Sequence, residues 1–325
     1  MNYRNIGNLR VSSLGLGCMG MSEYYGSPNK NESIETIHHA LDLGINFFDT
    51  ADQYGLGKNE ELVGQALINV RQQVHIATKF GFIRSSNGNV IKINGNPKYI
   101  KAACEASLKR LKTDYIDLYY LHRVDPTIPI EETVGAMKDL VIEGKVREIG
   151  LSEVSPQNIQ RAYKIHPIAA LQSEYSIWSR EIETKTLKAC RDLNIAIVPY
   201  SPLGRGFLSG KIKCIDSLDL TDYRRTTPRF QDDNLKHNLL MLEKLENIAF
   251  KLNITVSQLA LAWLLSKGKD IIPIPGTKRV NYLNENIASI QIELTDGITQ
   301  LIDEIAPIGS TAGDRYPTEA MKLLE

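Results

Sequence analysis

The chain has 325 residues, of which 42% are hydrophobic and 23% charged, the balance of a soluble globular protein with one large core. Lys and Arg together number 38, as do Asp and Glu, so no net charge attracts nucleic acid or an anionic membrane. Four scattered cysteines without a CxxC pair exclude a disulfide scaffold and a cysteine-based zinc site, and we expect no metal.

The first residues, MNYRNIGNLR, lack the apolar core of a signal peptide. No apolar run is long enough to span a bilayer. We therefore expect a cytoplasmic protein without a membrane partner. The sequence carries no signal for an oligomeric state.

Short apolar runs alternate with amphipathic helical segments along the whole chain. Residues 3–13, YRNIGNLRVSS, predict a hairpin with its turn at Gly7–Asn8. In the helix after the fifth run, Ser155 and Pro156 supply the N-cap and first-turn signals. In chain order, the predicted strands lie at 13–17, 46–49, 74–80, 116–122, 146–152, 168–173, 195–201 and 271–276. The predicted helices lie at 31–44, 59–70, 97–112, 130–144, 155–166, 181–194, 239–253, 257–268, 282–289 and 297–306.

The order of these elements predicts the fold class. Strands that read as continuous apolar runs, each followed by a helix, form parallel sheets. Eight such units without a linker predict an α/β fold of the (β/α)₈ TIM-barrel type, with an N-terminal β-hairpin and long loops at the C-terminal face. We expect residues 1–325 to form a single domain.

Two local patterns point to other dehydrogenase classes. Gly15–Gly20, GLGCMG, fits G-x-G-x-x-G, but in a dinucleotide-binding Rossmann unit a helix opens at once, and here turn residues follow until about Asn31. Tyr54 and Lys58 fit the Y-x-x-x-K of short-chain dehydrogenases, which needs both residues one helical turn apart. Two glycines between them make a helix unfavourable. We favour a barrel-mouth loop in both places.

Polar residues recur where the predicted strands end. Asp49 ends the second strand with Tyr54 in its loop, Lys79 lies near the end of the third, and His122 ends the fourth. Singly, each residue is explained by a cap, a turn, a surface charge or a packed core histidine. Catalytic groups of a barrel gather at this face, so four of them on adjacent strands predict an active site.

The chemistry that fits these residues is carbonyl reduction. Hydride addition to a carbonyl carbon leaves charge on the oxygen, which needs a proton. The hydroxyl of Tyr54 can supply it, and a lysine ammonium lowers the phenol's ordinary pKa of about 10. Lys79 would provide that ammonium, Asp49 would hold Lys79, and His122 would hydrogen-bond the carbonyl oxygen.

With these residues in place, the chain resembles the aldo-keto reductase family, in the branch of perakine-reductase-type and auxin-induced proteins and bacterial relatives. The resemblance runs over nearly the whole length, through GLGCMGMSEYYG, DTADQYGLGKNEELVGQAL, IATKFG, LYYLHRVD, GKVREIGLSE, LQSEYSIWSR, PYSPLGRGFLSG and IPIPGTKRV. It implies an NADPH-dependent enzyme that acts on a small carbonyl substrate, with a catalytic tetrad at Asp49, Tyr54, Lys79 and His122.

The same resemblance implies the cofactor contacts. Ser152 and Gln172 would bind the carboxamide, and Tyr200 would stack on the nicotinamide ring. The pyrophosphate would lie along Ser201, Leu203, Gly204, Arg205 and Lys211. The 2′-phosphate and adenine would meet Gly276, Thr277, Lys278, Glu285 and Asn286, at the start of a helix. Glu153 stands where many branches carry Asn; a carboxylate accepts from the carboxamide but cannot donate, so this contact must differ.

Loop residues predict the substrate pocket. Apolar walls suit an aldehyde or ketone with a hydrophobic body. The expected lining is Met21, Tyr24, Phe80 and Trp178.

Two other functions compete with the reductase. Potassium-channel β subunits use the same barrel as an NADP-binding regulatory module, but carry Asn at the histidine position, where this chain has His122. A Rossmann hydroxyacid dehydrogenase would instead bind its cofactor at Gly15, Gly17 and Gly20.

Overall fold

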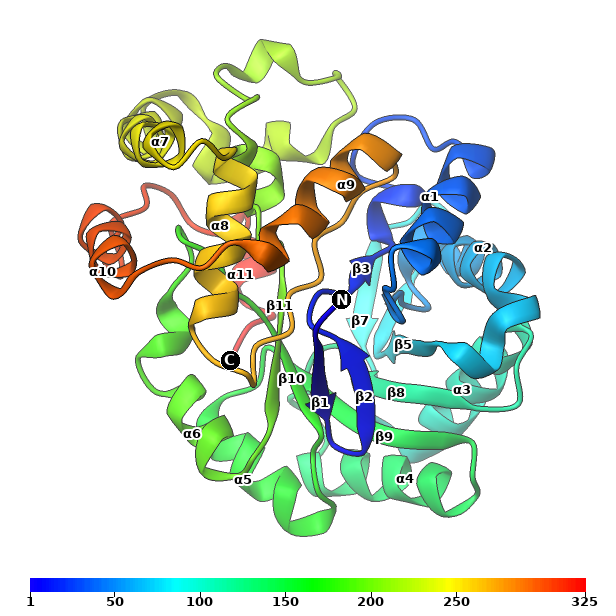
Figure 1. The fold of residues 1–325 in the computed structure, drawn as a ribbon. Helices are drawn as coiled ribbons and strands as arrows, with labels where there is room; N and C mark the ends of the chain where they lie inside the picture. The colour runs from blue at the N-terminus through cyan, green and yellow to red at the C-terminus, as the bar shows by residue number, and fades with distance from the viewer.

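The computed structural model describes residues 1–325, and its centre is a parallel barrel (Figure 1). Seven strands pair side by side in the order β11-β10-β9-β8-β5-β4-β3. Their bounds are β3 (Leu16–Gly17), β4 (Phe47–Asp49), β5 (His75–Phe80), β8 (Ile116–Leu121), β9 (Val146–Ser152), β10 (Ala170–Glu174) and β11 (Ala196–Tyr200). The predicted (β/α)₈ barrel is thereby confirmed as the fold class.

The predicted eighth strand closes the barrel without forming a regular ladder. Ile272 and Ile274 donate to carbonyls of β11, at 2.8 and 3.0 Å. On the other side Gly15 and Gly17 donate to the carbonyls of Pro273 and Pro275, at 2.9 and 3.2 Å. The two prolines have no N–H to return, so the seam with β3 carries only half of its bonds.

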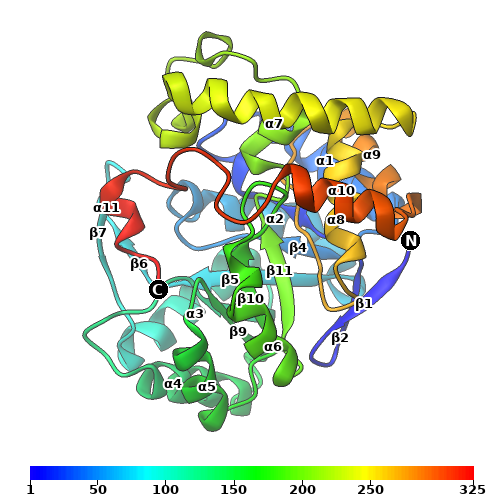
Figure 2. The same cartoon turned by 90° about the vertical axis from the view of Figure 1, so that its left-hand side faces the viewer.

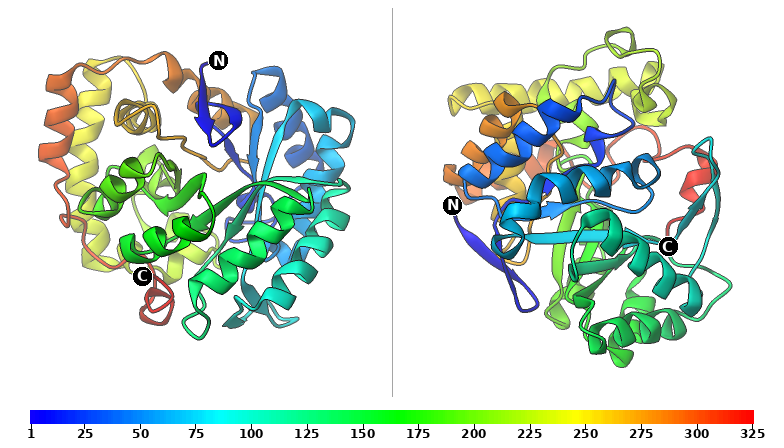
Figure 3. Two further views of the ribbon diagram at one scale, coloured as in Figure 1. Left: turned by 90° about the horizontal axis from the view of Figure 1, so that it is seen from below. Right: turned by 90° about the vertical axis from the view of Figure 1, so that its right-hand side faces the viewer.

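Helices surround the barrel, as the view from below shows (Figure 3). The first six follow strands: α1 (Lys30–Asp42), α2 (Lys58–Leu67), α3 (Pro97–Leu111), α4 (Ile130–Ile142), α5 (Pro156–Ile165) and α6 (Thr186–Asp192). The rest are α7 (Asp232–Lys251), α8 (Val256–Ser266), α9 (Val280–Ala288), α10 (Asp296–Ile305) and α11 (Thr318–Met321). The predicted cap of α5 is present, since the Ser155 side chain accepts from the N–H of Asn158. No single helix has the length and apolar content of a membrane span; α7 and α8 reach it only together, bent by 89°.

Strand alternation divides the core into two layers. On β5, Ala77 belongs to the cluster inside the barrel, whereas Ile76 and Phe80 belong to the cluster beneath the helices. Neighbouring β8 does the same with Tyr120 inside and Tyr119 outside. Because side chains alternate along a strand, Lys79 shares the inner face with Ala77.

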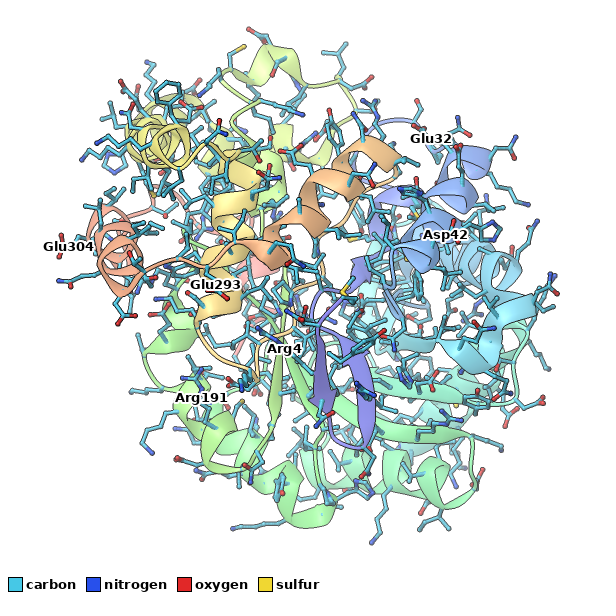
Figure 4. The ribbon with its side chains drawn as sticks, viewed as in Figure 1. Arg4, Glu32, Asp42, Arg191, Glu293 and Glu304 are labelled. Atoms are coloured by element: carbon cyan, nitrogen blue, oxygen red, sulfur yellow. The ribbon has the colours of Figure 1, made fainter.

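The predicted N-terminal hairpin, β1 (Tyr3–Ile6) and β2 (Leu9–Ser12), pairs antiparallel. Its Ile6, Leu9 and Val11 join the inner cluster with residues that begin several strands, so the hairpin covers the N-terminal end of the barrel. Burying such a side chain contributes about 1.5–3 kcal/mol. Arg4, labelled in Figure 4, donates to the carbonyls of Leu265 and Gly268 and ties the hairpin to the C-terminal end of α8 and the residues that follow it.

Three segments differ from the prediction. A second hairpin, β6 (Phe82–Arg84) and β7 (Val90–Ile93), extends the loop after β5. Helix α7 begins seven residues before the predicted start at residue 239, at Asp232. Beyond α10, residues 306–325, here called the C-terminal tail, return past the barrel to α11, beside β6 and β7 (Figure 2).

Candidate active site

The four residues predicted at the strand ends come together at the C-terminal face of the barrel. Lys79 Nζ lies 2.5 Å from Asp49 Oδ1, 2.8 Å from the carbonyl oxygen of Thr50 and 3.5 Å from the hydroxyl of Tyr54. The second carboxylate oxygen of Asp49 accepts from Gln172 Nε2 at 2.7 Å. The ring centroids of Tyr54 and His122 are 5.9 Å apart.

The loop that carries Tyr54 turns sharply over the strand ends. Tyr54–Gly57 form a tight turn in which Gly55, Leu56 and Gly57 all have positive φ angles, of 57°, 55° and 90°. Glycines relieve the strain at two of these positions. The turn buries the phenol while Lys58 begins α2 and is exposed to solvent. Lys58 is therefore not the lysine beside Tyr54.

Burial, rather than the lysine, controls the acidity of Tyr54. Burial raises its pKa well above 10, and the carboxylate of Asp49 adds to the rise. We expected Lys79 to lower this pKa, but the net shift is upward, because burial outweighs any effect of the ammonium. Burial also lowers the pKa of Lys79, against the pull of Asp49. Tyr54 is thus a neutral phenol.

His122 is held as a neutral ring. Phe82 packs edge-on against it at 4.9 Å between centroids, and the side-chain amide of Gln53 lies 3.3 Å from Nε2. Burial lowers the pKa of His122 well below 6.5, and Lys79 and Arg123 lower it further. A neutral imidazole can donate one hydrogen bond to an oxygen without competing for the proton of Tyr54.

The three residues predicted to meet the nicotinamide lie next to the tetrad. The side-chain amide of Gln172 donates to Asp49, which is a member of the tetrad. The hydroxyl of Ser152 accepts from Arg123 Nη1 at 3.1 Å. Tyr200 ends β11, and its hydroxyl lies 2.8 Å from that of Tyr316 in the C-terminal tail. All three are bonded to protein groups here.

Glu153 has a different role from the one its position predicted. Both of its oxygens accept from Arg315 of the C-terminal tail, at 3.1 and 3.2 Å. It also accepts from the N–H of Glu174 at 2.8 Å. Although burial raises its pKa, Arg315 and Arg123 hold that pKa below the ordinary value, so Glu153 is ionised. This carboxylate anchors the tail to the barrel.

The residues predicted at the phosphates form two groups. Lys211 Nζ lies 4.0 Å from the ring centroid of Tyr282 on α9, and Lys278 donates to the carbonyls of Tyr25 and Ser27, both at 2.8 Å. Neither ammonium has a carboxylate within ion-pair distance. By contrast, Arg205 is buried and pairs with Glu174 at 3.3 Å.

The remaining predicted residues lie along the same two loops. Ser201, Leu203 and Gly204 follow β11, where Ser201 and Gly204 have φ angles of 48° and 55°. Gly276 and Thr277 precede α9, and the hydroxyl of Thr277 accepts from the N–H of Arg279. Glu285 and Asn286 lie on α9, with Asn286 buried.

The predicted pocket lining is wrong in part. Phe80 is fully buried beneath the helices against Tyr119, with centroids 4.8 Å apart, since it points away from the face that carries Lys79. Trp178 is buried and stacks on Phe207 at 4.3 Å. A Cβ on Gly204 would lie 2.6 Å from its indole, so Trp178 supports the loop after β11. Met21 is also buried, and Tyr24 packs edge-on against Tyr223.

Several residues at the site were not anticipated, among them Gln53 beside His122. Phe82 contacts His122, while Arg315 and Tyr316 come from the C-terminal tail. Arg123 is 8% exposed and donates to the carbonyl of His122 at 2.6 Å. Its position directly after His122 was the only sequence signal for any of them.

Comparisons with known proteins point to one protein family. A model described as the aldo/keto reductase family matches residues 13–307. The chain is 49% identical over 308 residues to a probable aldo-keto reductase 1 of Glycine max, covering 94% of this chain and 88% of that protein. It is 45% identical to aldo-keto reductase yakc of Schizosaccharomyces pombe, whose name includes NADP(+), covering 98% and 95%.

Solved structures show the same fold. A glycerol dehydrogenase of Gluconobacter oxydans superposes with a TM-score of 0.86 at 30% identity, over 93% of this chain and 94% of that one. An aldo/keto reductase of Klebsiella pneumoniae, solved with NADP and acetate, superposes with a TM-score of 0.74 at 27% identity, over 96% and 97%.

Proposed function

Because this chain belongs to the aldo/keto reductase family, we propose that it reduces an aldehyde or ketone to an alcohol with NADPH, using Tyr54 as the proton donor. The single observation that carries the mechanism is the cluster of Lys79 with Asp49 and Tyr54, buried beside His122. The same proposal takes residues 1–325 as one domain, since the hairpin and the tail both bind the barrel.

The residues present suit a nicotinamide dinucleotide phosphate. Tyr200 offers a half-buried aromatic ring beside the amide of Gln172 and the hydroxyl of Ser152. Lys211 and Lys278 are cations without carboxylate partners, as anionic phosphates require. When bound, the cofactor supplies the hydride; everything else in the reaction falls to the chain.

The chain's own groups then act on the substrate oxygen. The neutral ring of His122 donates a hydrogen bond that orients the carbonyl. Tyr54, kept protonated by its raised pKa, gives its proton to the oxygen as negative charge develops there. Lys79 stabilises the phenolate that results, and Asp49 and the carbonyl of Thr50 keep the ammonium in place.

The test is NADPH oxidation with 4-nitrobenzaldehyde, followed by absorbance, for the wild type and Tyr54→Phe. We expect many turnovers by the wild type and a loss of about a hundredfold or more in the variant, since a positioned acid contributes roughly 10²–10⁴-fold. Cofactor binding, measured by fluorescence, should be unchanged. A wild type that binds NADPH but turns over no carbonyl in a broad panel would instead indicate a regulatory NADP-binding module.

A further inference from the structure

Arg123 is a buried cation without a counter-ion. Only 8% of the residue is exposed, and no carboxylate oxygen lies within ion-pair distance of its guanidinium. Nη1 donates to the carbonyl of His122 and to the hydroxyl of Ser152, both neutral acceptors. Nε and Nη2 have no hydrogen bond within the protein. Burying a charge without an ion-pair partner is costly, and an anion bound at these free donors would offset that cost.

The carboxylates around Arg123 are already committed to other groups. Glu153 binds Arg315 through both oxygens. Asp49 is taken by Lys79 and Gln172, and Asp125 accepts from the N–H groups of Gly95 and Thr127. Of the three charged side chains Arg123, Arg315 and Glu153, the last two pair with each other, and Arg123 is left without an ion-pair partner.

The position of Arg123 assigns that charge to the substrate. Its guanidinium carbon lies 6.0 Å from the ring centroid of Phe82, which itself packs on His122. Burial opposes its charge, yet Tyr200, Tyr316 and Glu153 nearby raise the pKa of Arg123 above its ordinary value. The cations suited to the cofactor phosphates, Lys211 and Lys278, lie on other loops. An anion at Arg123 would therefore lie beside His122, where the carbonyl group binds.

We propose that Arg123 binds a carboxylate of the substrate, so that the preferred substrates are oxo acids, aldehydes or ketones that carry a carboxylate. This inference rests on the proposed reductase function. The planar guanidinium suits such a partner, because its free N–H donors match the oxygens of a carboxylate. No covalent step is added; Arg123 determines which carbonyl compounds are held with their oxygen at Tyr54 and His122.

The experiment compares matched substrates that differ only in charge. The three isomers of formylbenzoate are measured against their methyl esters, which keep the aldehyde and the ring but lose the negative charge. For the wild type we expect kcat/KM to be about tenfold or more higher for at least one acid than for its ester. Charge-assisted hydrogen bonds of about 1.5–3 kcal/mol correspond to roughly ten- to a hundredfold.

Variants then assign the preference to Arg123. Arg123→Met should lower the ratio of kcat/KM for the preferred acid to that for its ester by roughly ten- to a hundredfold, mainly through the KM of the acid. Arg123→Lys, which keeps the charge, should retain part of the preference. Arg161→Met, on the exposed face of α5, is the control and should retain all of it.

The possible outcomes separate this inference from the proposed function. A wild type that reduces esters and acids equally well overturns the role of Arg123 and leaves the reductase intact. The role is equally overturned if acid and ester fall together in Arg123→Met, since Arg123 then only positions Ser152 and His122. If the wild type reduces none of the six aldehydes, nor 4-nitrobenzaldehyde, the reductase function itself fails.

Discussion

The ammonium of Lys79 lies 3.5 Å from the hydroxyl of Tyr54, although the two residues are 25 positions apart in the chain. Lys58 is only four positions from Tyr54 but faces solvent at the start of α2. Neighbouring parallel strands lie about 4.8 Å apart, which explains why Lys79, although distant in sequence, is the lysine close to Tyr54 in space.

Lys79→Met should therefore abolish turnover and retain NADPH. Without the ammonium, the phenolate left after proton transfer is unstabilised, and kcat should fall by about a hundredfold or more. Lys58→Met is the matched control and should change little. Both are measured by steady-state reduction of one aldehyde, with cofactor affinity by fluorescence. A Lys79→Met protein within about tenfold of the wild type would remove the tetrad from the mechanism.

Lys278→Met should weaken NADPH binding roughly ten- to a hundredfold and leave NADH binding nearly unchanged. The reason is that only NADPH has a 2′-phosphate to form the charge-assisted bond, worth about 1.5–3 kcal/mol. Equilibrium titration of both cofactors checks this, with exposed Lys269→Met as the control. Equal losses for both cofactors would mean that Lys278 acts only by holding the carbonyls of Tyr25 and Ser27.

Tyr200 should act through its ring. Tyr200→Phe loses only the hydrogen bond to Tyr316 and should keep NADPH affinity within a few-fold. Tyr200→Ala should lose about 1–3 kcal/mol of binding energy, the range of base–aromatic stacking. The comparison is by fluorescence titration. If Phe is as damaging as Ala, the hydroxyl and its link to the tail matter more than stacking.

His122 should make stability depend on pH in one direction. Its folded-state pKa lies well below 6.5, so the unfolded chain takes up a proton near pH 6.5 and the folded protein does not. The contribution of the neutral ring to the free energy of unfolding is fully present above that pH. It declines as the pH falls, by up to about 1.4 kcal/mol per pH unit. Urea unfolding at pH 7.5, 6.5 and 5.5 should show the wild type losing stability relative to His122→Gln. Parallel pH profiles would contradict the lowered pKa.

Glu153 and Arg315 should show strong coupling. Removing Arg315 leaves a buried carboxylate unpaired, and breaking such pairs costs about 3–5 kcal/mol. Arg315→Met should therefore be less stable than the double variant Glu153→Gln/Arg315→Met, in which residue 153 carries no charge. A double-mutant cycle by denaturant unfolding measures this. Additive effects would show that the pair does not hold the tail.

The fold was predictable because its signals are local. Apolar runs separated by amphipathic helices define a parallel barrel, and the strand-end rule brings Asp49, Lys79 and His122 to one face. The position of Phe80 could have been found too. Since it follows Lys79 on the same strand, alternation places it on the opposite face.

Other parts of the site leave no local pattern. Arg315 and Glu153 form an ion pair although they are 162 residues apart in the sequence, and no local pattern near either residue predicts the pair. The acidity of Tyr54 depends on how deeply it is buried and on how near the carboxylate of Asp49 lies. Both are outcomes of packing that residue types alone do not specify.

Pro273 and Pro275, whose missing N–H groups leave the barrel seam half-bonded, also bear on how the chain avoids aggregation. Without β3, the segment from Ile271 to Gly276, paired to β11, would be an open edge of the sheet. An exposed edge normally invites strands from other molecules. Here Pro273 and Pro275 face outward and have no N–H to donate to a strand of another molecule. Gly15 and Gly17 need only the carbonyl oxygens of these two prolines as acceptors. The seam thus accepts its own partner and offers little to any other.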